Sequence, residues 1–213
     1  MPLKHHIEQE IKLTALDQAS LDSLVRSSLV QQYLHHSCEQ GETQRFAAIY
    51  YDSPDWILRK RRWSLRTRYE GPRHVSTLKR NSTQRDGFSS CEEIEQSIDQ
   101  AFNRVACIPA GKIADALNSI LPADAVLIPR VEVTMQRTKR ILQVGETRIE
   151  LVTDSGHISG NGKTMALFEV ELEKLEGDLQ SPATQAFTEA LMDAFSLRPS
   201  QQSKHRIGLS FYD

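Results

Sequence analysis

Residues 7–12 of this chain read Ile7-Glu8-Gln9-Glu10-Ile11-Lys12, and this short stretch decides the fold. Apolar and charged side chains alternate along it. The apolar residues of one parity are Ile7, Ile11 and Leu13, and the charged residues of the other are Glu8, Glu10 and Lys12. Successive side chains of a β-strand point to opposite faces. The spacing therefore predicts a strand over residues 5–13 with one apolar face and one face that carries both signs of charge.

Charged residues recur at even spacing in later stretches of the chain. They are Arg66 and Arg68, Lys79, Arg137 and Lys139, Glu150 and Asp154, and Glu169, Glu171 and Glu173. On a flat sheet such faces would meet water. If the sheet curls closed with these faces inward, its interior holds acids and bases together, and buried charges need ion-pair partners, a metal or a charged ligand. The ligand implied is a polyanion held by Arg and Lys and by a divalent cation on carboxylates.

The remaining periodicities predict an α+β fold of about eight antiparallel strands with flanking helices. Helices are predicted over 16–34 and 182–195, with short helical stretches within 98–121. Further strands are predicted over 46–51, 63–69, 74–80, 88–98, 131–144, 147–152 and 165–175, with residues 155–163 as a connection and 203–211 as a short final segment. Since the sequence contains neither a repeat nor a long linker, residues 1–213 are expected to form one domain.

Composition narrows the class of protein. The chain has 26 Lys and Arg against 28 Asp and Glu, for a formal net charge of −2, and 39% hydrophobic residues. This balance argues against disorder and against binding nucleic acid or membranes through bulk charge. No apolar run reaches the roughly 18 residues of a membrane span. Three separate cysteines and a start without an apolar secretory segment predict a cytoplasmic protein.

Residues 160–164 (Gly160-Asn161-Gly162-Lys163-Thr164) resemble the end of a phosphate-binding P-loop. Such a loop needs a glycine five positions before its second glycine, and His157 stands there. A P-loop must also open a helix, whereas residues 165–175 read as a strand. We therefore predict a hairpin turn at 160–164.

Eight motifs, taken in order, resemble the CYTH superfamily of triphosphate tunnel metalloenzymes. They are ExExK at 8–12, YYDSPD at 50–55, LRTR at 65–68, TLK at 77–79, RTK at 137–139, IELVTD at 149–154, FEVELE at 168–173 and SK at 203–204. Together they span nearly the whole chain. The resemblance implies an eight-stranded antiparallel β-barrel, open at both ends, that binds triphosphate compounds in its lumen with Mg²⁺ or Mn²⁺.

The resemblance also implies roles for individual residues. Metal ligands are expected at Glu8 and Glu10, completed by one or more of Glu169, Glu171 and Glu173. Phosphate contacts are expected at Lys12, Arg66, Arg68, Lys79, Arg137, Lys139 and Lys204. The candidate catalytic residues are Lys12, Glu150 and Asp154, with the two acids orienting water, a second metal or the basic residues. The chain departs from the family at Cys91, because many relatives have Arg two positions before a Glu; the role of Glu93 and compensation by Arg85 are left open.

These residues predict metal-dependent hydrolysis of a triphosphate. Inorganic triphosphate is the expected substrate, because the residues named suit phosphate or metal and none suits an adenine or a thiazole. Two other reactions in the same tunnel are alternatives: thiamine triphosphate hydrolysis, and the class IV adenylyl cyclase reaction from ATP to cyclic AMP and pyrophosphate. A non-catalytic polyphosphate- or nucleotide-binding module is a further alternative. The oligomeric state is not predicted.

Overall fold

The computed structural model describes residues 4–35, 42–70 and 73–213. Its strands are β1 (Lys4–Thr14), β2 (Glu42–Asp52), β3 (Ser64–Glu70), β4 (Arg73–Arg85), β5 (Phe88–Ile98), β6 (Ile128–Val144), β7 (Thr147–Gly160), β8 (Lys163–Glu176) and β9 (Arg198–Pro199). Its α-helices are α1 (Gln18–Arg26), α2 (Ser28–Gln31), α3 (Ile57–Lys60), α4 (Lys112–Asn118), α5 (Pro182–Phe195) and α6 (Lys204–Leu209), with 3₁₀ turns η1 (Val105–Cys107) and η2 (Ser210–Tyr212). Within these ranges no helix is both long and apolar enough to cross a membrane.

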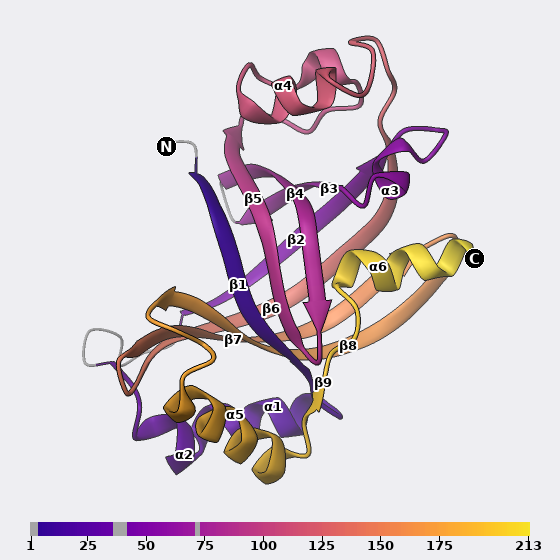
Figure 1. Cartoon of the computed structure of the whole chain (residues 1–213). Coiled ribbons are helices and arrows are strands. Elements are labelled where there is room, and N and C mark those ends of the chain that lie inside the picture. The colour runs from indigo at the N-terminus through magenta and orange to yellow at the C-terminus, as the bar shows by residue number, and fades with distance from the viewer. Residues whose placement is uncertain (1–3, 36–41, 71–72) are drawn as a thin grey trace.

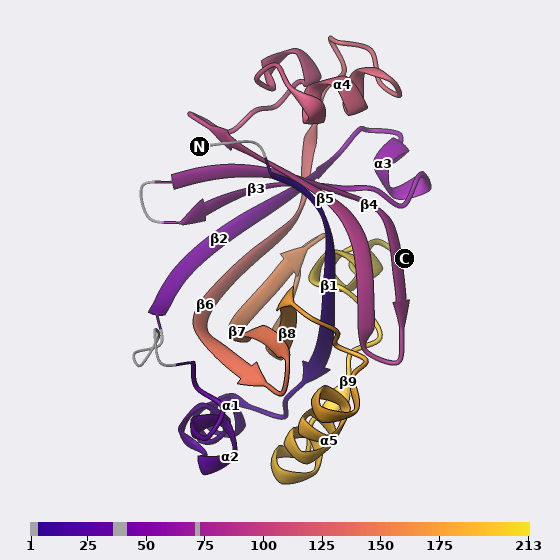
Figure 2. The same cartoon turned by 60° about the vertical axis from the view of Figure 1, so that its left-hand side comes forward.

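Eight antiparallel strands close into a barrel (Figures 1 and 2). The ring runs β1-β5-β4-β3-β2-β6-β7-β8 and closes because β1 pairs with both β5 and β8. The short β9 pairs with the end of β1 at Leu13 and Thr14. Closure places alternate residues of each strand inside the barrel. The predicted eight-stranded antiparallel barrel is confirmed, with one strand more than predicted.

Strand β7 continues through residues 155–160, which the sequence pattern wrongly assigns to a connection. This half of the strand is rich in small and polar residues, yet it pairs with both β6 and β8. Gly156 is required there, since a Cβ would lie 2.0 Å from the carbonyl oxygen of Thr134. The β7–β8 hairpin turns at Asn161 (φ 49°) and Gly162 (φ 72°), which have the left-handed backbone of a tight two-residue turn. The predicted hairpin turn is confirmed.

The predicted helix over 16–34 is wrong in its continuity, because two helices occupy this region. Asp17 begins α1 by accepting a hydrogen bond from the backbone N–H of Ser20 at 2.8 Å. Ser27 has an extended backbone, ends α1, and caps α2 by accepting from the N–H of Val30 at 3.2 Å. A serine hydroxyl that satisfies a free helix N–H offers the chain this alternative to helix continuation. The final segment predicted at 203–211 is helical.

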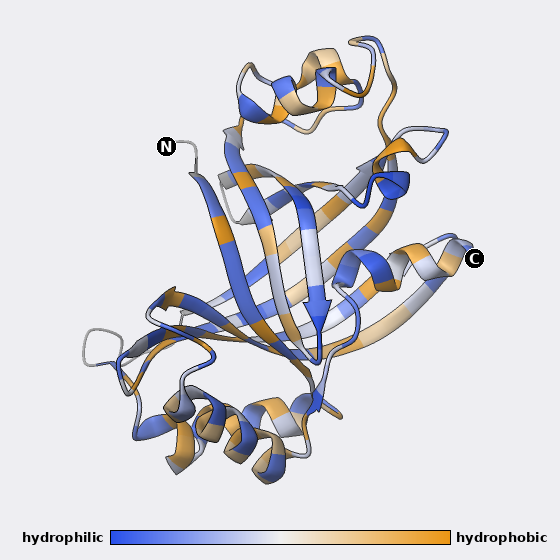
Figure 3. Cartoon of the chain, viewed as in Figure 1, coloured by the Kyte–Doolittle hydropathy of each residue, from blue (hydrophilic) through white to orange (hydrophobic). Residues whose placement is uncertain are grey.

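Helices cover the apolar outer faces of the barrel (Figure 1). Helices α1, α2 and α5 pack on β1, β6, β7 and β8 around residues such as Leu13, Leu151 and Leu172. At the opposite end, α4 and its flanking turns cover β3 to β5 around Leu65 and Leu78. Hydrophilic and hydrophobic residues alternate along the strands, as Figure 3 shows. Where these helices pack, the outward parity is therefore the apolar one, which leaves the charged parity for the lumen.

One end of the barrel interior is also apolar. Val131, Val133 and Met135 of β6 share the lumen face with Arg137, and they pack with Leu209 of α6. Gly208 permits this close approach, since a Cβ there would lie 2.2 Å from a methyl group of Val131. The lumen face of β6 thus changes from apolar to basic along the strand, and α6 fills the apolar end.

Candidate active site in the barrel lumen

The charged part of the lumen is a cavity of about 1140 Å³. All seven basic residues expected to contact phosphate line it, namely Lys12, Arg66, Arg68, Lys79, Arg137, Lys139 and Lys204. The acidic residues that the barrel strands contribute to its lining are Glu8, Glu10, Glu93, Glu95, Glu150, Glu171 and Glu173. These residues come from seven of the eight barrel strands and from α6. The alternation seen in the sequence, together with barrel closure, accounts for their convergence.

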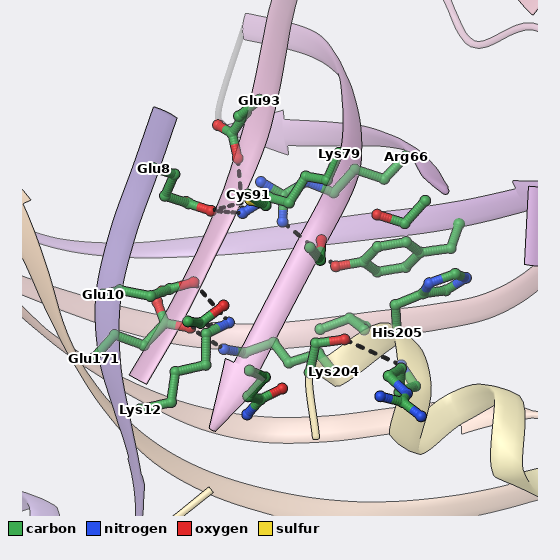
Figure 4. A pocket seen from close by; sticks show the side chains of 18 of the residues that line it. Glu8, Glu10, Lys12, Arg66, Lys79, Cys91, Glu93, Glu171, Lys204 and His205 are labelled. Atoms are coloured by element: carbon green, nitrogen blue, oxygen red, sulfur yellow. Dashed lines mark hydrogen bonds and ion pairs between the residues drawn. The ribbon is translucent and has the colours of Figure 1, made fainter. Parts of the chain in front are cut away.

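Lys79 forms a first cluster with Glu8, Cys91 and Glu93 (Figure 4). Its Nζ contacts Glu8 and lies 2.7 Å from Oε2 of Glu93. The Cys91 thiol donates to Glu8 at 3.1 Å. Burial disfavours the charge of Lys79, but Glu93 and Glu8 outweigh burial and raise its pKa. Burial also raises the pKa of Cys91 to about 12, so Glu8 lies beside an ammonium group and a neutral thiol.

Glu171 is the centre of a second cluster. Lys204 and Arg137 donate to its carboxylate at 2.7 Å and 3.0 Å. The Nζ of Lys12 lies 3.6 Å from Glu171 and 3.0 Å from Glu10. Burial opposes the ionisation of Glu171, but Lys204, Arg137 and Lys12 hold its pKa well below the usual range. The charge of this carboxylate is therefore compensated by the protein itself.

At one wall of the lumen, carboxylates crowd one another. Glu10 lies directly opposite Glu173 in the β1–β8 ladder, and Glu173 lies directly opposite Glu150 in the β7–β8 ladder. Burial, followed by Glu8, Glu150 and Glu10, raises the pKa of Glu173 to about 7. Burial also raises the pKa of Glu10, which Lys12 offsets only in part. Crowded carboxylate oxygens suit a hard divalent cation, so this donor set fits Mg²⁺ or Mn²⁺.

Asp154 and Glu169 lie beneath the cavity wall and do not line it; both are 0% exposed. Asp154 accepts two hydrogen bonds from Arg137, at 2.7 Å and 2.6 Å. Lys204 lies 2.9 Å from Asp154 and also contacts Glu169. Ligand atoms of Asp154, Glu169 and Glu171 lie within 4.8 Å of one another, as do those of Glu8, Cys91 and Glu93. In the group of Asp154, Glu169 and Glu171, the positive charge that balances the carboxylates comes from Lys204 and Arg137.

Other lining residues were not assigned from the sequence. Glu95 is one of them, and it lies 3.2 Å from Arg68. Because Glu95 shares a strand face with Cys91 and Glu93, strand parity could have identified it. Tyr50 and His205 also line the cavity, and they carry no sequence signal that links them. Arg85 does not compensate for Cys91. It lies at the exposed β4–β5 turn, 3.4 Å from Asp86, and does not line the cavity.

Comparison with known proteins places this geometry in context. HpAC1 of Hippeastrum, named as an adenylyl cyclase with a dominant triphosphatase activity, is 18% identical, with 95% of each chain covered and a TM-score of 0.68. An adenylate cyclase-like protein of Bacillus halodurans is 19% identical, with 95% of this chain and 97% of that chain covered and a TM-score of 0.60. PH1819 of Pyrococcus horikoshii is 17% identical, with 94% and 98% covered and a TM-score of 0.55.

These structural similarities concern the fold. The family model of the CYTH domain matches the sequence itself over residues 6–206. This match begins in β1 and ends in α6, so it includes every strand that closes the barrel. The chain therefore belongs to the CYTH domain family.

Proposed function

We propose that this protein hydrolyses inorganic triphosphate to diphosphate and phosphate, with Mg²⁺ or Mn²⁺ as the cofactor. The observation that carries the proposal is the convergence of seven basic side chains and a row of crowded carboxylates in one cavity. A triphosphate with roughly four negative charges matches several Arg and Lys side chains at once. A divalent cation bound to the carboxylates would add to the positive charge of these side chains.

The arginines and the lysines of the lumen are suited to different kinds of phosphate contact. Arg66, Arg68 and Arg137 offer planar forks that match phosphate oxygens, whereas a lysine such as Lys12 or Lys79 offers a compact charge. Lys139 and Lys204 complete the set of proposed phosphate contacts. In the structure most of these cations are engaged by carboxylates. Phosphate binding then requires an exchange of ion-pair partners.

The cation is proposed to bind Glu8, Glu10 and Glu173, with Glu171 at the edge of this set. When bound, it withdraws charge from the phosphoryl oxygens and from the leaving diphosphate. Lys79 and Lys12 each have a second carboxylate besides these proposed ligands, namely Glu93 and Glu171. Glu169 is proposed to be a positioning residue and not a metal ligand. It is fully buried against Lys204 and holds that side chain in place.

Of the three candidate catalytic residues, Lys12 and Glu150 are proposed to act on the substrate, and Asp154 is proposed to position Arg137. Lys12 keeps its charge, because Glu10, Glu171 and Glu169 outweigh burial and raise its pKa, so its Nζ can stabilise the developing negative charge. Glu150 lines the cavity, accepts from Lys139 at 2.8 Å and is proposed to orient the attacking water. Asp154 acts through Arg137. Positioning and electrostatics then supply the rate acceleration without a covalent nucleophile.

This proposal treats residues 1–213 as one domain with a small-molecule partner, acting in the cytoplasm and without nucleic acid. The triphosphatase activity named for HpAC1 is compatible with it. Trp63 lines the cavity near its basic residues, which keeps a substrate with an organic group as the competing possibility. The experiment must therefore compare substrates directly.

The test is a substrate panel with Mg²⁺ and with Mn²⁺, comprising inorganic triphosphate, ATP and thiamine triphosphate, with each product identified. We expect the fastest release of phosphate from inorganic triphosphate. Faster formation of cyclic AMP and pyrophosphate from ATP would make the protein a cyclase, and faster hydrolysis of thiamine triphosphate would make it a thiamine triphosphatase. Tight triphosphate binding without turnover would identify a binding module.

A further inference from the structure

Arg66 differs from the other six basic residues of the lumen in its surroundings. Each of those six has a carboxylate within ion-pair distance. For Arg66, no such carboxylate is found among the described residues, and its buried Nε has no hydrogen-bond partner there. Its hydrogen-bond partner is the Tyr50 hydroxyl, 3.4 Å from Nη1. An anion can therefore bind Arg66 without displacing an acid.

The Tyr50 hydroxyl complements this unpaired guanidinium. Tyr50 is 5% exposed and lines the cavity from β2, with Arg66 opposite it on β3. Its oxygen accepts from Arg66, so its own hydrogen is left to donate, and the described residues offer it no acceptor. Burial raises the pKa of Tyr50, but Arg66, Lys204 and Lys79 outweigh burial and lower it. A phenol in such a positive environment is a strong donor toward an anionic oxygen.

His205 of α6 holds the Tyr50 ring. The two rings stack with centroids 4.9 Å apart and an interplanar angle of 14°. Burial, followed by Arg59, lowers the pKa of His205 to about 4, so the imidazole is neutral near pH 7. The stack therefore fixes the phenol without adding a charge to the anion site. Lys204, the preceding residue, fastens α6 to the barrel through Glu169 and Glu171.

Resting on the proposed function, we infer that Tyr50 is a further substrate-binding residue whose hydroxyl donates to an oxygen of the phosphate group held by Arg66, and that His205 is the positioning residue for Tyr50. Besides the hydrogen bond between them, Arg66 and Tyr50 offer donors that no described carboxylate engages, which suits a phosphate group better than a neutral ligand. This pair is the part of the lumen that is ready for phosphate before any ion pair is exchanged.

The first test measures binding of inorganic triphosphate by calorimetry in EDTA, for the wild type, Tyr50→Phe and Tyr51→Phe. Tyr51 is the matched control, because it is adjacent on β2, faces outward, and its hydroxyl lies 3.2 Å from that of Thr67. We expect Tyr50→Phe to weaken binding about tenfold, as for a lost hydrogen bond to a charged group. Tyr51→Phe should stay within about twofold of the wild type. Equal affinity of Tyr50→Phe and the wild type would overturn the inference.

The second test is a double-mutant cycle for His205. His205→Ala should weaken binding severalfold in the wild type and cause no further loss in the Tyr50→Phe background, because it acts through the hydroxyl. His205→Phe, which keeps a stacking ring, should restore the affinity. A loss of equal size in both backgrounds would overturn the positioning role, since His205 would then act independently of Tyr50.

Turnover with Mg²⁺ separates this inference from the proposed function. If the wild type hydrolyses inorganic triphosphate and Tyr50→Phe binds it unchanged, the inference alone is wrong. If binding depends on Tyr50 but no hydrolysis occurs, the proposed function alone is wrong. Absence of any triphosphate binding by the wild type would overturn both.

Discussion

Glu10 of β1 lies directly opposite Glu173 of β8 in the antiparallel ladder that closes the barrel. Like charges placed directly opposite each other destabilise a sheet. The metal-free protein therefore carries an unfavourable interaction at the seam of its own barrel, and a divalent cation bound there would relieve it.

Replacement of an acid on β1 tests the metal site. Glu8→Gln or Glu10→Gln should abolish turnover while the fold is kept, because each change removes an anionic ligand oxygen and preserves the side-chain shape. The wild type should also gain thermal stability on addition of Mg²⁺, and Glu10→Gln should lose most of this gain. Glu92→Gln is the control, since Glu92 faces outward and pairs with Arg80. A near wild-type rate for Glu10→Gln at saturating Mg²⁺ would show that β1 does not hold the metal.

The crowded carboxylates of Glu10, Glu150 and Glu173 predict that the stability of the fold depends on pH. The pKa of Glu173 is raised to about 7 in the folded protein, so its stabilising contribution is complete below the unfolded value of 4.5 and is lost as the pH rises through 7. After allowance for solvent screening, this loss is on the order of 1–2 kcal/mol of unfolding free energy. Urea unfolding of metal-free protein at about pH 5 and pH 8 should show it. The change should be smaller in Glu173→Gln; an equal change in both proteins would contradict the prediction.

Loss of a shared phosphate contact should affect every triphosphate alike. Arg66→Ala and Lys79→Ala should each lower kcat/KM about 100-fold for inorganic triphosphate, ATP and thiamine triphosphate. The reason is that these side chains face the common phosphate part of the substrates. Arg140→Ala, on the outer parity of β6, is the control and should remain active. A variant that loses activity toward only one substrate would assign that residue to the organic group.

Lys204 should matter for stability as well as for binding. Its ammonium group contacts Glu169 and lies 2.9 Å from Asp154, and both acids are fully buried. Lys204→Met leaves these carboxylates less compensated and should lower the unfolding free energy by about 3–5 kcal/mol. Adding Glu169→Gln to this variant should recover part of the loss. Denaturant unfolding measures both changes, with the exposed Arg206→Met on the same helix as the control.

Strand parity made much of the fold and the site predictable. Glu8, Glu10 and Lys12 occupy one parity of β1, and the other parity is apolar at Ile11 and Leu13, where the helices pack on it. Parity cannot tell how deeply a side chain lies, so Glu169 looked equivalent to Glu171 although only Glu171 lines the cavity. The burial of Glu169 involves its contact with Lys204, which comes from α6, an element distant in the sequence.

Close backbone approach and long-range pairing were not predictable. Gly156 and its small, polar neighbours in β7 read as a loop, because the contact with Thr134 that requires glycine belongs to the tertiary structure. The stack of Tyr50 on His205 joins residues that are far apart in the sequence. No local periodicity encodes that contact, since it depends on α6 entering the barrel.

The double pairing of β1 has a consequence for the nascent chain. Among the barrel strands β1 is synthesised first, whereas its partner β8 is synthesised last. Until then the edge of β1 that β8 will cover stays open, and non-local strand pairing of this kind is slow. A chain that lacks β8 therefore has an unclosed barrel and no enclosed lumen. Until β8 is made, the same open edge is free to pair with strands of other chains, which favours aggregation.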